Sequence, residues 1–178
     1  MKTKITDFLA TDPLALTGFL FEPAENTNRI AIFLHGNGNS SALSSLSLSE
    51  EMINELHKEQ CAYLTFNNRG AGYMAKLRNA EIGKKVWGGT AYEKIEECVA
   101  DIDGAISFTA SRGYTDITLV DLSSGANKAC VCIATCIDPI RIHETRLVLE
   151  KALEGPVGIS VHAEEEIQMS NFDDVLTF

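Results

Sequence analysis

Three short apolar runs, each followed by a polar break that contains glycine, constrain most strongly what this chain can fold into. Arg29–Leu34 is followed by His-Gly-Asn-Gly, Cys61–Phe66 by Asn-Asn-Arg-Gly, and Ile117–Val120 by Asp-Leu-Ser-Ser-Gly. Near-continuous apolar runs of this length are typical of strands buried on both faces of a parallel sheet. We therefore expect buried strands that each end in a loop with unusual backbone freedom.

Helical patterns separate these runs. Ser47 and Glu50 fit a capping box ahead of apolar residues at helical spacing. A second apolar stripe predicts a helix that begins near Thr90 and is closed by Gly113, and small residues predict a third helix over 126–135. Because strands that alternate with helices form βαβ units, the sequence predicts an α/β fold, a mainly parallel sheet with helices on both faces.

The two ends of the chain are less regular. Lys4–Leu9 and Leu16–Phe21 predict two short strands before the first buried run. We expect a single domain over 1–178, in which 1–135 gives the clear pattern and 136–178 leaves the C-terminal part of the sheet incomplete. An open sheet edge exposes unpaired N–H and C=O groups, so a homodimer could cover it.

The charge balance excludes several classes of partner. Of the 178 residues, 25 are acidic and 15 are basic, which gives a formal net charge of −10 and a pI of about 4.8. Such a surface repels phosphate backbones and anionic lipid, so neither nucleic acid nor a membrane is expected as a partner. The sequence has no apolar run long enough to span a bilayer, and its first residues lack the apolar core of a signal peptide.

The five cysteines are odd in number and scattered along the chain, at Cys61, Cys98, Cys130, Cys132 and Cys136. This arrangement indicates reduced thiols in a cytoplasmic protein rather than a disulfide framework. No CxxC pair is present, so we interpret the thiols as small core residues and expect neither a bound metal nor a cofactor.

Ser123 lies in a context that suits a nucleophile. A serine hydroxyl is weakly nucleophilic and needs exposure, a base, and donors for the oxyanion that forms. A sharp turn from the strand at 117–120 into the next helix would expose Ser123 and place the helix N-terminus beneath the developing charge. Gly125 allows a close backbone approach, and the Ser124 N–H is one candidate oxyanion donor. A solvated serine in an ordinary βα turn is the alternative interpretation.

The loop His35-Gly36-Asn37-Gly38 is the candidate for the second oxyanion donor. Its glycines allow backbone N–H groups to converge on one point. We choose the Asn37 N–H as the donor, with His35 and Gly36 as supporting residues. A glycine-rich loop that binds nothing is one alternative. A phosphate loop is another, although no Gly-Lys-Ser/Thr sequence follows.

Together these motifs resemble those of the α/β-hydrolase family. The resemblance is carried by Phe33-Leu-His-Gly-Asn-Gly38, Phe66-Asn-Asn-Arg-Gly-Ala-Gly72 and Leu119-Val-Asp-Leu-Ser-Ser-Gly125, in the family's order, and covers roughly residues 1–135. It implies an esterase-, lipase- or amidase-like serine hydrolase that uses a Ser–acid–His triad on a small-molecule acyl substrate.

The elbow departs from the family pattern Gly-x-Ser-x-Gly, because Asp121 stands at the first glycine. We expect its side chain to crowd the strained turn and its negative charge to oppose oxyanion formation.

The triad acid and histidine should follow the serine in that order. We predict His162 as the base with Asp138 as the acid. His143 is an alternative base, and Glu165 or Glu166 is an alternative acid that leaves no histidine behind it. The leading function is hydrolysis of an ester or related acyl bond. Its rival is a non-catalytic binding module that keeps the hydrolase scaffold.

Overall fold

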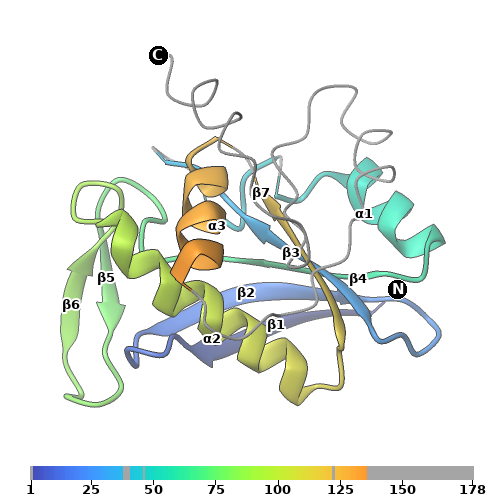
Figure 1. The fold of residues 1–178 in the computed structure, drawn as a ribbon, viewed down its shortest axis with the longest axis horizontal. Coiled ribbons are helices and arrows are strands. Elements are labelled where there is room, and N and C mark those ends of the chain that lie inside the picture. The colour runs from blue at the N-terminus through green and yellow to red at the C-terminus, as the bar shows by residue number, and fades with distance from the viewer. Residues whose placement is uncertain (1, 38–40, 46, 122, 136–178) are drawn as a thin grey trace.

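The computed structural model describes residues 2–37, 41–45, 47–121 and 123–135 (Figure 1). The strands are β1 (Lys2–Leu9), β2 (Ala15–Glu22), β3 (Arg29–Leu34), β4 (Ala62–Phe66), β5 (Ala75–Arg78), β6 (Lys85–Gly88) and β7 (Asp116–Asp121). The helices are α1 (Glu50–Lys58), α2 (Cys98–Ser111) and α3 (Ser124–Thr135). In the described part of the chain, no helix is long and apolar enough to cross a membrane. The predictions for 136–178 lie outside the described residues.

The main sheet has the strand order β1-β2-β4-β3-β7. β3 pairs in parallel with both β4 and β7, whereas β2 pairs antiparallel with both β1 and β4. Four of the five strands therefore run in one direction, and β2 alone is reversed. The predicted α/β fold with a mainly parallel sheet is confirmed.

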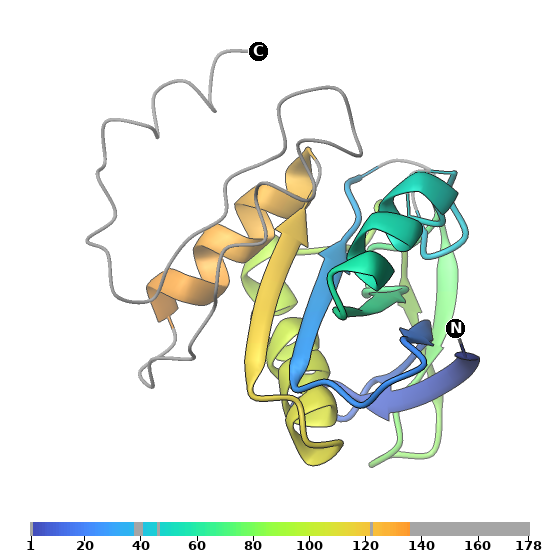
Figure 2. The same cartoon turned by 90° about the vertical axis from the view of Figure 1, so that its right-hand side faces the viewer.

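The two faces of the sheet carry separate apolar clusters, because successive side chains of a strand point to opposite faces. Ile30, Ile32 and Leu34 of β3 pack in the cluster that contains α2 residues, while Ala31 and Phe33 pack in the cluster that contains α1 residues. Figures 1 and 2 show α1 on one side of the sheet and α2 with α3 on the other. Helices therefore cover both faces, as the buried strands require.

The cap of α1 differs from the sequence prediction. Ser49, not Ser47, caps the helix, and its side chain accepts the N–H of Met52. Ser47 is fully buried and holds the preceding loop instead: its hydroxyl donates to the Ser41 carbonyl, and its own carbonyl accepts the Tyr63 hydroxyl. The long-range contact with Tyr63 decides between two serines that the local sequence cannot separate.

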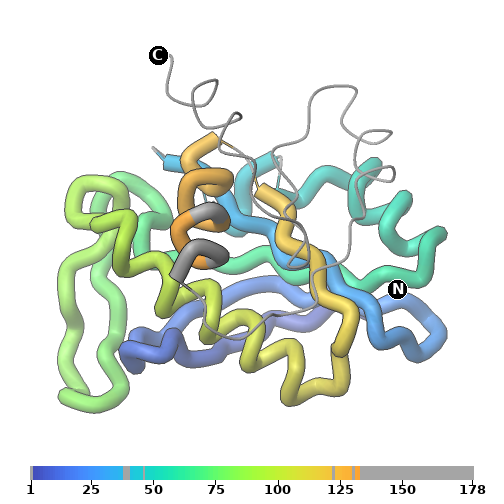
Figure 3. The backbone as a smooth tube through the Cα atoms, viewed as in Figure 1, coloured from blue at the N-terminus to red at the C-terminus, as the bar shows by residue number. Residues whose placement is uncertain are grey.

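The start of α2 and the segment before it also differ from the prediction. The helix begins at Cys98, after a 3₁₀ turn at Ile95–Glu97, rather than near Thr90. The N–H of Thr90 donates to the Gly72 carbonyl, so the backbone at Thr90 is held against the loop after β4. The sequence analysis did not predict the antiparallel β5–β6 hairpin, which stands beside the sheet next to the β1–β2 turn (Figure 3).

Arg69, in the loop after β4, is the centre of a buried ionic network. Its side chain is 5% exposed and binds the fully buried Asp101 through Nε and Nη2 and through its backbone N–H. Asp12 and Glu97, at the surface, bind the remaining edges of the guanidinium at 2.9 and 3.0 Å. Burial alone would lower the pKa of Arg69, but the hydrogen bonds and charges of Asp101 and Asp12 raise it. The network ties the β1–β2 turn, the loop after β4 and α2 together.

We predict that Arg69→Met destabilises the protein by about 3–5 kcal/mol, because Asp101 then lies buried without its cation. Arg78→Met, at an exposed position of β5, is the matched control and should change stability by less than about 0.5 kcal/mol. Urea unfolding of the two variants measures the difference. Equal stabilities would show that the network contributes nothing.

Candidate active site at the carboxyl edge of the sheet

Ser123 lies in the turn between β7 and α3, and its backbone is strained. Its φ is 57°, a left-handed value that L-residues other than glycine rarely adopt. The side chain is exposed, and the Ser123 carbonyl accepts the N–H of Ala126 at 3.0 Å in the first turn of α3. The turn therefore presents the hydroxyl to solvent at the N-terminus of a helix, which favours negative charge.

Gly125 allows this turn to be tight. A Cβ on Gly125 would collide with the Leu34 carbonyl of β3 and would lie 3.4 Å from the Asp121 Cβ. Because Leu34 pairs with Asp121, β3 and β7 end at the same level. The loop after β3 and the turn at Ser123 consequently leave the same edge of the sheet side by side (Figure 2).

The loop after β3 carries Asn37, whose N–H is the predicted second oxyanion donor. Gly36 is buried and Asn37 is exposed, directly beyond the carboxyl end of β3. Residues 38–40 lie outside the described part of the chain. The topology thus places Asn37 and Ser123 at one edge, in neighbouring connections.

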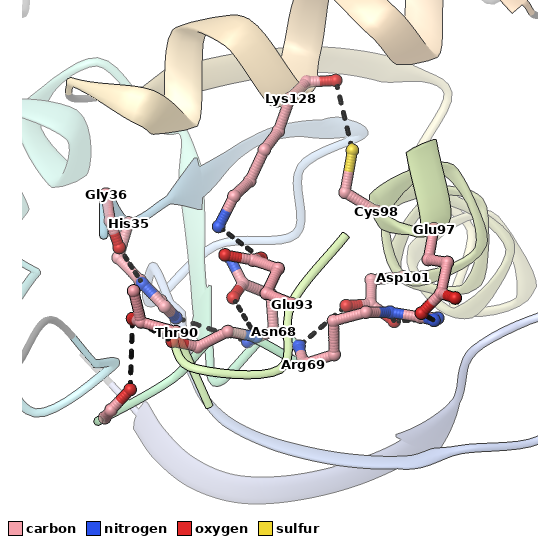
Figure 4. A network of polar contacts seen from close by, with 12 residues as sticks. His35, Gly36, Asn68, Arg69, Thr90, Glu93, Glu97, Cys98, Asp101 and Lys128 are labelled. Carbon is pink, nitrogen blue, oxygen red and sulfur yellow. Dashed lines mark hydrogen bonds and ion pairs between the residues drawn. The ribbon is translucent and has the colours of Figure 1, made fainter. Parts of the chain in front are cut away.

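His35 is a structural histidine that joins two loops. It is 1% exposed, its Nδ1 lies 2.9 Å from the Gly36 carbonyl, and its Nε2 accepts the Asn68 N–H at 3.3 Å (Figure 4). These partners require the neutral tautomer with the proton on Nδ1. Burial lowers the pKa of His35 to about 4, and the charge of Lys128 acts in the same direction. Both ring nitrogens are engaged, so His35 is not a general base.

Asp121 is buried at the end of β7, and among the described residues neither of its carboxyl oxygens has a hydrogen-bond partner. Burial raises its pKa from 3.8 to about 7. Below that pH the carboxyl is predominantly protonated, so the negative charge expected from the sequence is suppressed by desolvation. The Asp121 Cβ lies close to this turn, because a Cβ added to Gly125 would meet it at 3.4 Å.

Comparison with solved structures identifies the architecture. An esterase of Pyrococcus furiosus is similar at 19% identity with a TM-score of 0.55, over 76% of this chain and 47% of that one. The α/β hydrolase GrgF from Penicillium has 16% identity and a TM-score of 0.58, over 76% and 43%. Est1E of Butyrivibrio proteoclasticus, solved with ferulic acid, has 16% identity and a TM-score of 0.54, over 71% and 46%.

This chain has an α/β-hydrolase-like fold. No family model and no curated protein matches the sequence. The chain spans less than half the length of these solved hydrolases. In this hydrolase-like fold the turn at Ser123 occupies the connection between a parallel strand and the helix that follows it.

The predicted triad partners lie outside the described residues. His162, Asp138 and the alternative base His143 all fall in 136–178. The other histidine of the described part, besides His35, is His57 in the last turn of α1. That turn leads into the start of β4, so His57 lies at the sheet edge opposite to Ser123. Among the described residues, no group of three His, Cys, Asp or Glu side chains is placed to hold a metal ion.

A pocket of about 340 Å³ lies between the β1–β2 turn, the β5–β6 hairpin and the start of α2. Arg69, Glu93 and Trp87 line it, and the Trp87 ring stacks on Tyr92 with centroids 5.7 Å apart. Trp87 therefore borders this pocket. Ser123 and Asn37 are not among the lining residues, so this pocket is separate from the candidate active site.

The sequence analysis missed Lys128 and Glu93, which form a buried ion pair at 2.6 Å. Lys128 follows Ser124 by one turn of α3, and Glu93 lies before α2. The one available signal was a lysine inside an otherwise small and apolar helix. Nothing in the local sequence could connect it with a glutamate so far away along the chain.

We predict that Ser123→Gly is more stable than Ser123→Ala by about 1 kcal/mol, because glycine adopts a φ of 57° without strain. Both variants lack the hydroxyl, so the comparison isolates the backbone. Thermal or urea unfolding of the two variants measures it. If Ser123→Ala were the more stable variant, the turn would not be left-handed in solution.

We also predict that Asp121→Asn changes the pH dependence of stability. Between pH 4 and 7 the folded state keeps a proton on Asp121 that the unfolded state has lost. The wild type should therefore lose about 1.4 kcal/mol per pH unit relative to Asp121→Asn as pH rises through this range, and no more above it. Urea unfolding from pH 5 to 9 measures the difference. A difference that does not vary with pH would show that Asp121 is ionised in the folded state.

Proposed function

We propose that this chain is a serine hydrolase that acts on an ester or related acyl bond of a small molecule, with Ser123 as the nucleophile. The single observation that carries the proposal is the exposed Ser123 at a φ of 57° between β7 and α3. Strained turns of this kind persist where surrounding structure enforces them, and they cluster at active sites. The similarity of the fold to solved esterases supports the same reaction class.

In the proposed reaction the Ser123 Oγ attacks the acyl carbon while a base takes its proton. The bond from the acyl carbon to the leaving oxygen breaks, and that oxygen receives the proton. Water then releases the acid from the acyl-enzyme by the reverse proton path. The Ser124 and Asn37 N–H groups stabilise the oxyanion, because both loops open at one edge of the sheet.

His162 is our proposed base and Asp138 its proposed acid, since a base must come from outside the described residues if His35 is engaged and His57 is remote. Asp121 does not interfere with the oxyanion below pH 7, because its carboxyl is held mainly in the neutral form. The proposed enzyme is therefore compatible with an acidic residue at the first position of the elbow.

A second candidate function is a binding module that keeps the scaffold without catalysis. The observation in its favour is that neither histidine of the described part is placed to activate Ser123. On this view the site edge binds a ligand without turning it over, and the serine is a surface residue.

A fluorophosphonate probe tests the proposed function. In the expected reaction the Ser123 Oγ bonds to phosphorus, fluoride leaves, and the serine proton passes to the base. We predict labelling of the wild-type protein and a complete loss of labelling in Ser123→Ala.

Ser111→Ala is the matched control, because Ser111 is also exposed but closes α2. It should label like the wild type. A folded wild-type protein that takes up no label would overturn the hydrolase and favour the binding module.

A further inference from the structure

The ion pair between Lys128 and Glu93 connects α3 with the segment before α2. Lys128 Nζ lies 2.6 Å from Glu93 Oε1, and the two side chains are 2% and 6% exposed. Within the described residues, no other charged group pairs with Lys128. A buried charge is tolerated only beside its partner, so neither side chain can leave the other without a large penalty.

Glu93 is in turn fixed by the loop that follows β4. Its N–H donates to the Gly89 carbonyl at 3.0 Å, and the Gly89 N–H donates to the Arg69 carbonyl at 2.7 Å. Its carboxylate packs over Gly70 so closely that a Cβ there would collide with it. Glu93 therefore moves together with the loop after β4.

That loop reaches the candidate oxyanion loop through Asn68 and His35. The Gly70 N–H donates to Asn68 Oδ1 at 3.0 Å, and the Asn68 N–H donates to His35 Nε2 at 3.3 Å. His35 then donates from Nδ1 to the Gly36 carbonyl at 2.9 Å. Figure 4 shows Lys128 extending from α3 toward Glu93, and His35 with its contacts to Asn68 and Gly36 on the other side of the same loop.

Lys128 is not placed to take a proton from Ser123. Its Nζ is buried against Glu93, whereas Ser123 is exposed at the first turn of the same helix. Any contribution that Lys128 makes to the reaction is therefore made through the position of α3 and not through contact with the reacting atoms.

We propose that Lys128 and Glu93 are positioning residues, which fix the helix that begins after Ser123 relative to the loop that carries Asn37. The inference rests on the proposed hydrolase function. An oxyanion donor acts only when it lies about 2.7–3.1 Å from the developing charge. A displacement of about 1 Å between the two loops is enough to reduce a rate by about 10²-fold.

The first test measures the rate of fluorophosphonate labelling at a temperature where each variant has native circular dichroism. Lys128→Met should lower the limiting labelling rate by about 10²-fold with little change in the half-saturating probe concentration. The double variant Lys128→Glu/Glu93→Lys restores a pair of the same combined length and should recover most of the rate. Lys94→Met, which removes an exposed lysine one residue from Glu93, should leave the rate unchanged.

The second test does not depend on labelling. Imidazole ¹⁵N NMR reports the tautomer and titration of His35, which faces Gly36, Asn68 and the charge of Lys128. In the wild type His35 should remain neutral with the proton on Nδ1 at pH 5.5. In Lys128→Met it should begin to titrate at that pH, because the Asn68 contact loosens and the nearby positive charge is gone.

The outcomes separate the two proposals. An unlabelled wild type overturns the hydrolase and with it the positioning role. A labelled wild type whose Lys128→Met variant has the same labelling rate and the same His35 spectrum overturns only the positioning role. A rate that falls in Lys128→Met and does not recover in the double variant also overturns it, because the charge pair would then not be the cause.

Discussion

The parallel pairing of β3 with β7 is the constraint on which the candidate site depends. Leu34 and Asp121 are partners in this ladder, so both strands stop at one level and both following loops open at one edge. Gly125 then allows α3 to lie directly over the Leu34 carbonyl. A change of register by one residue would reverse the faces of β7 and bury Ser123 or misdirect α3.

The parts of the fold that follow from local chemistry could be predicted from the sequence. β3 matches its predicted bounds because a strand covered on both faces must be apolar throughout, and Gly113 closes α2 with a φ of 94° as a helix C-terminus demands. The turn at Ser123 could also be predicted, because small residues separate the strand pattern from the helix pattern there. Asn37 lies at the same edge as Ser123 because β3 and β7 are parallel neighbours in the sheet.

The parts that depend on distant partners could not be predicted. By local sequence alone, Ser47 and Ser49 are equivalent helix caps. The hydrogen bond from the Tyr63 hydroxyl to the Ser47 carbonyl distinguishes them. Lys128 and Glu93 are charged residues that a sequence pattern assigns to the surface, and only their mutual contact makes burial tolerable. Arg69 and Asp101 follow the same rule, because each is buried against the other. Polar burial in this domain is decided by tertiary pairing and leaves no periodic signal.

Asp121 ends β7, and His35 directly follows the neighbouring strand β3. Burial shifts the pKa values of these two side chains in opposite directions. The acid has a pKa raised to about 7 and the imidazole a pKa lowered to about 4, so both are neutral in the folded protein. In the unfolded chain both are charged at pH 5 to 6. Folding in this range therefore amounts to the transfer of one proton from an imidazolium to a carboxylate, with no net exchange with solvent. Folding therefore leaves the combined charge of the two groups unchanged. Between pH 5 and 6 their separate contributions to the pH dependence of the free energy of unfolding cancel.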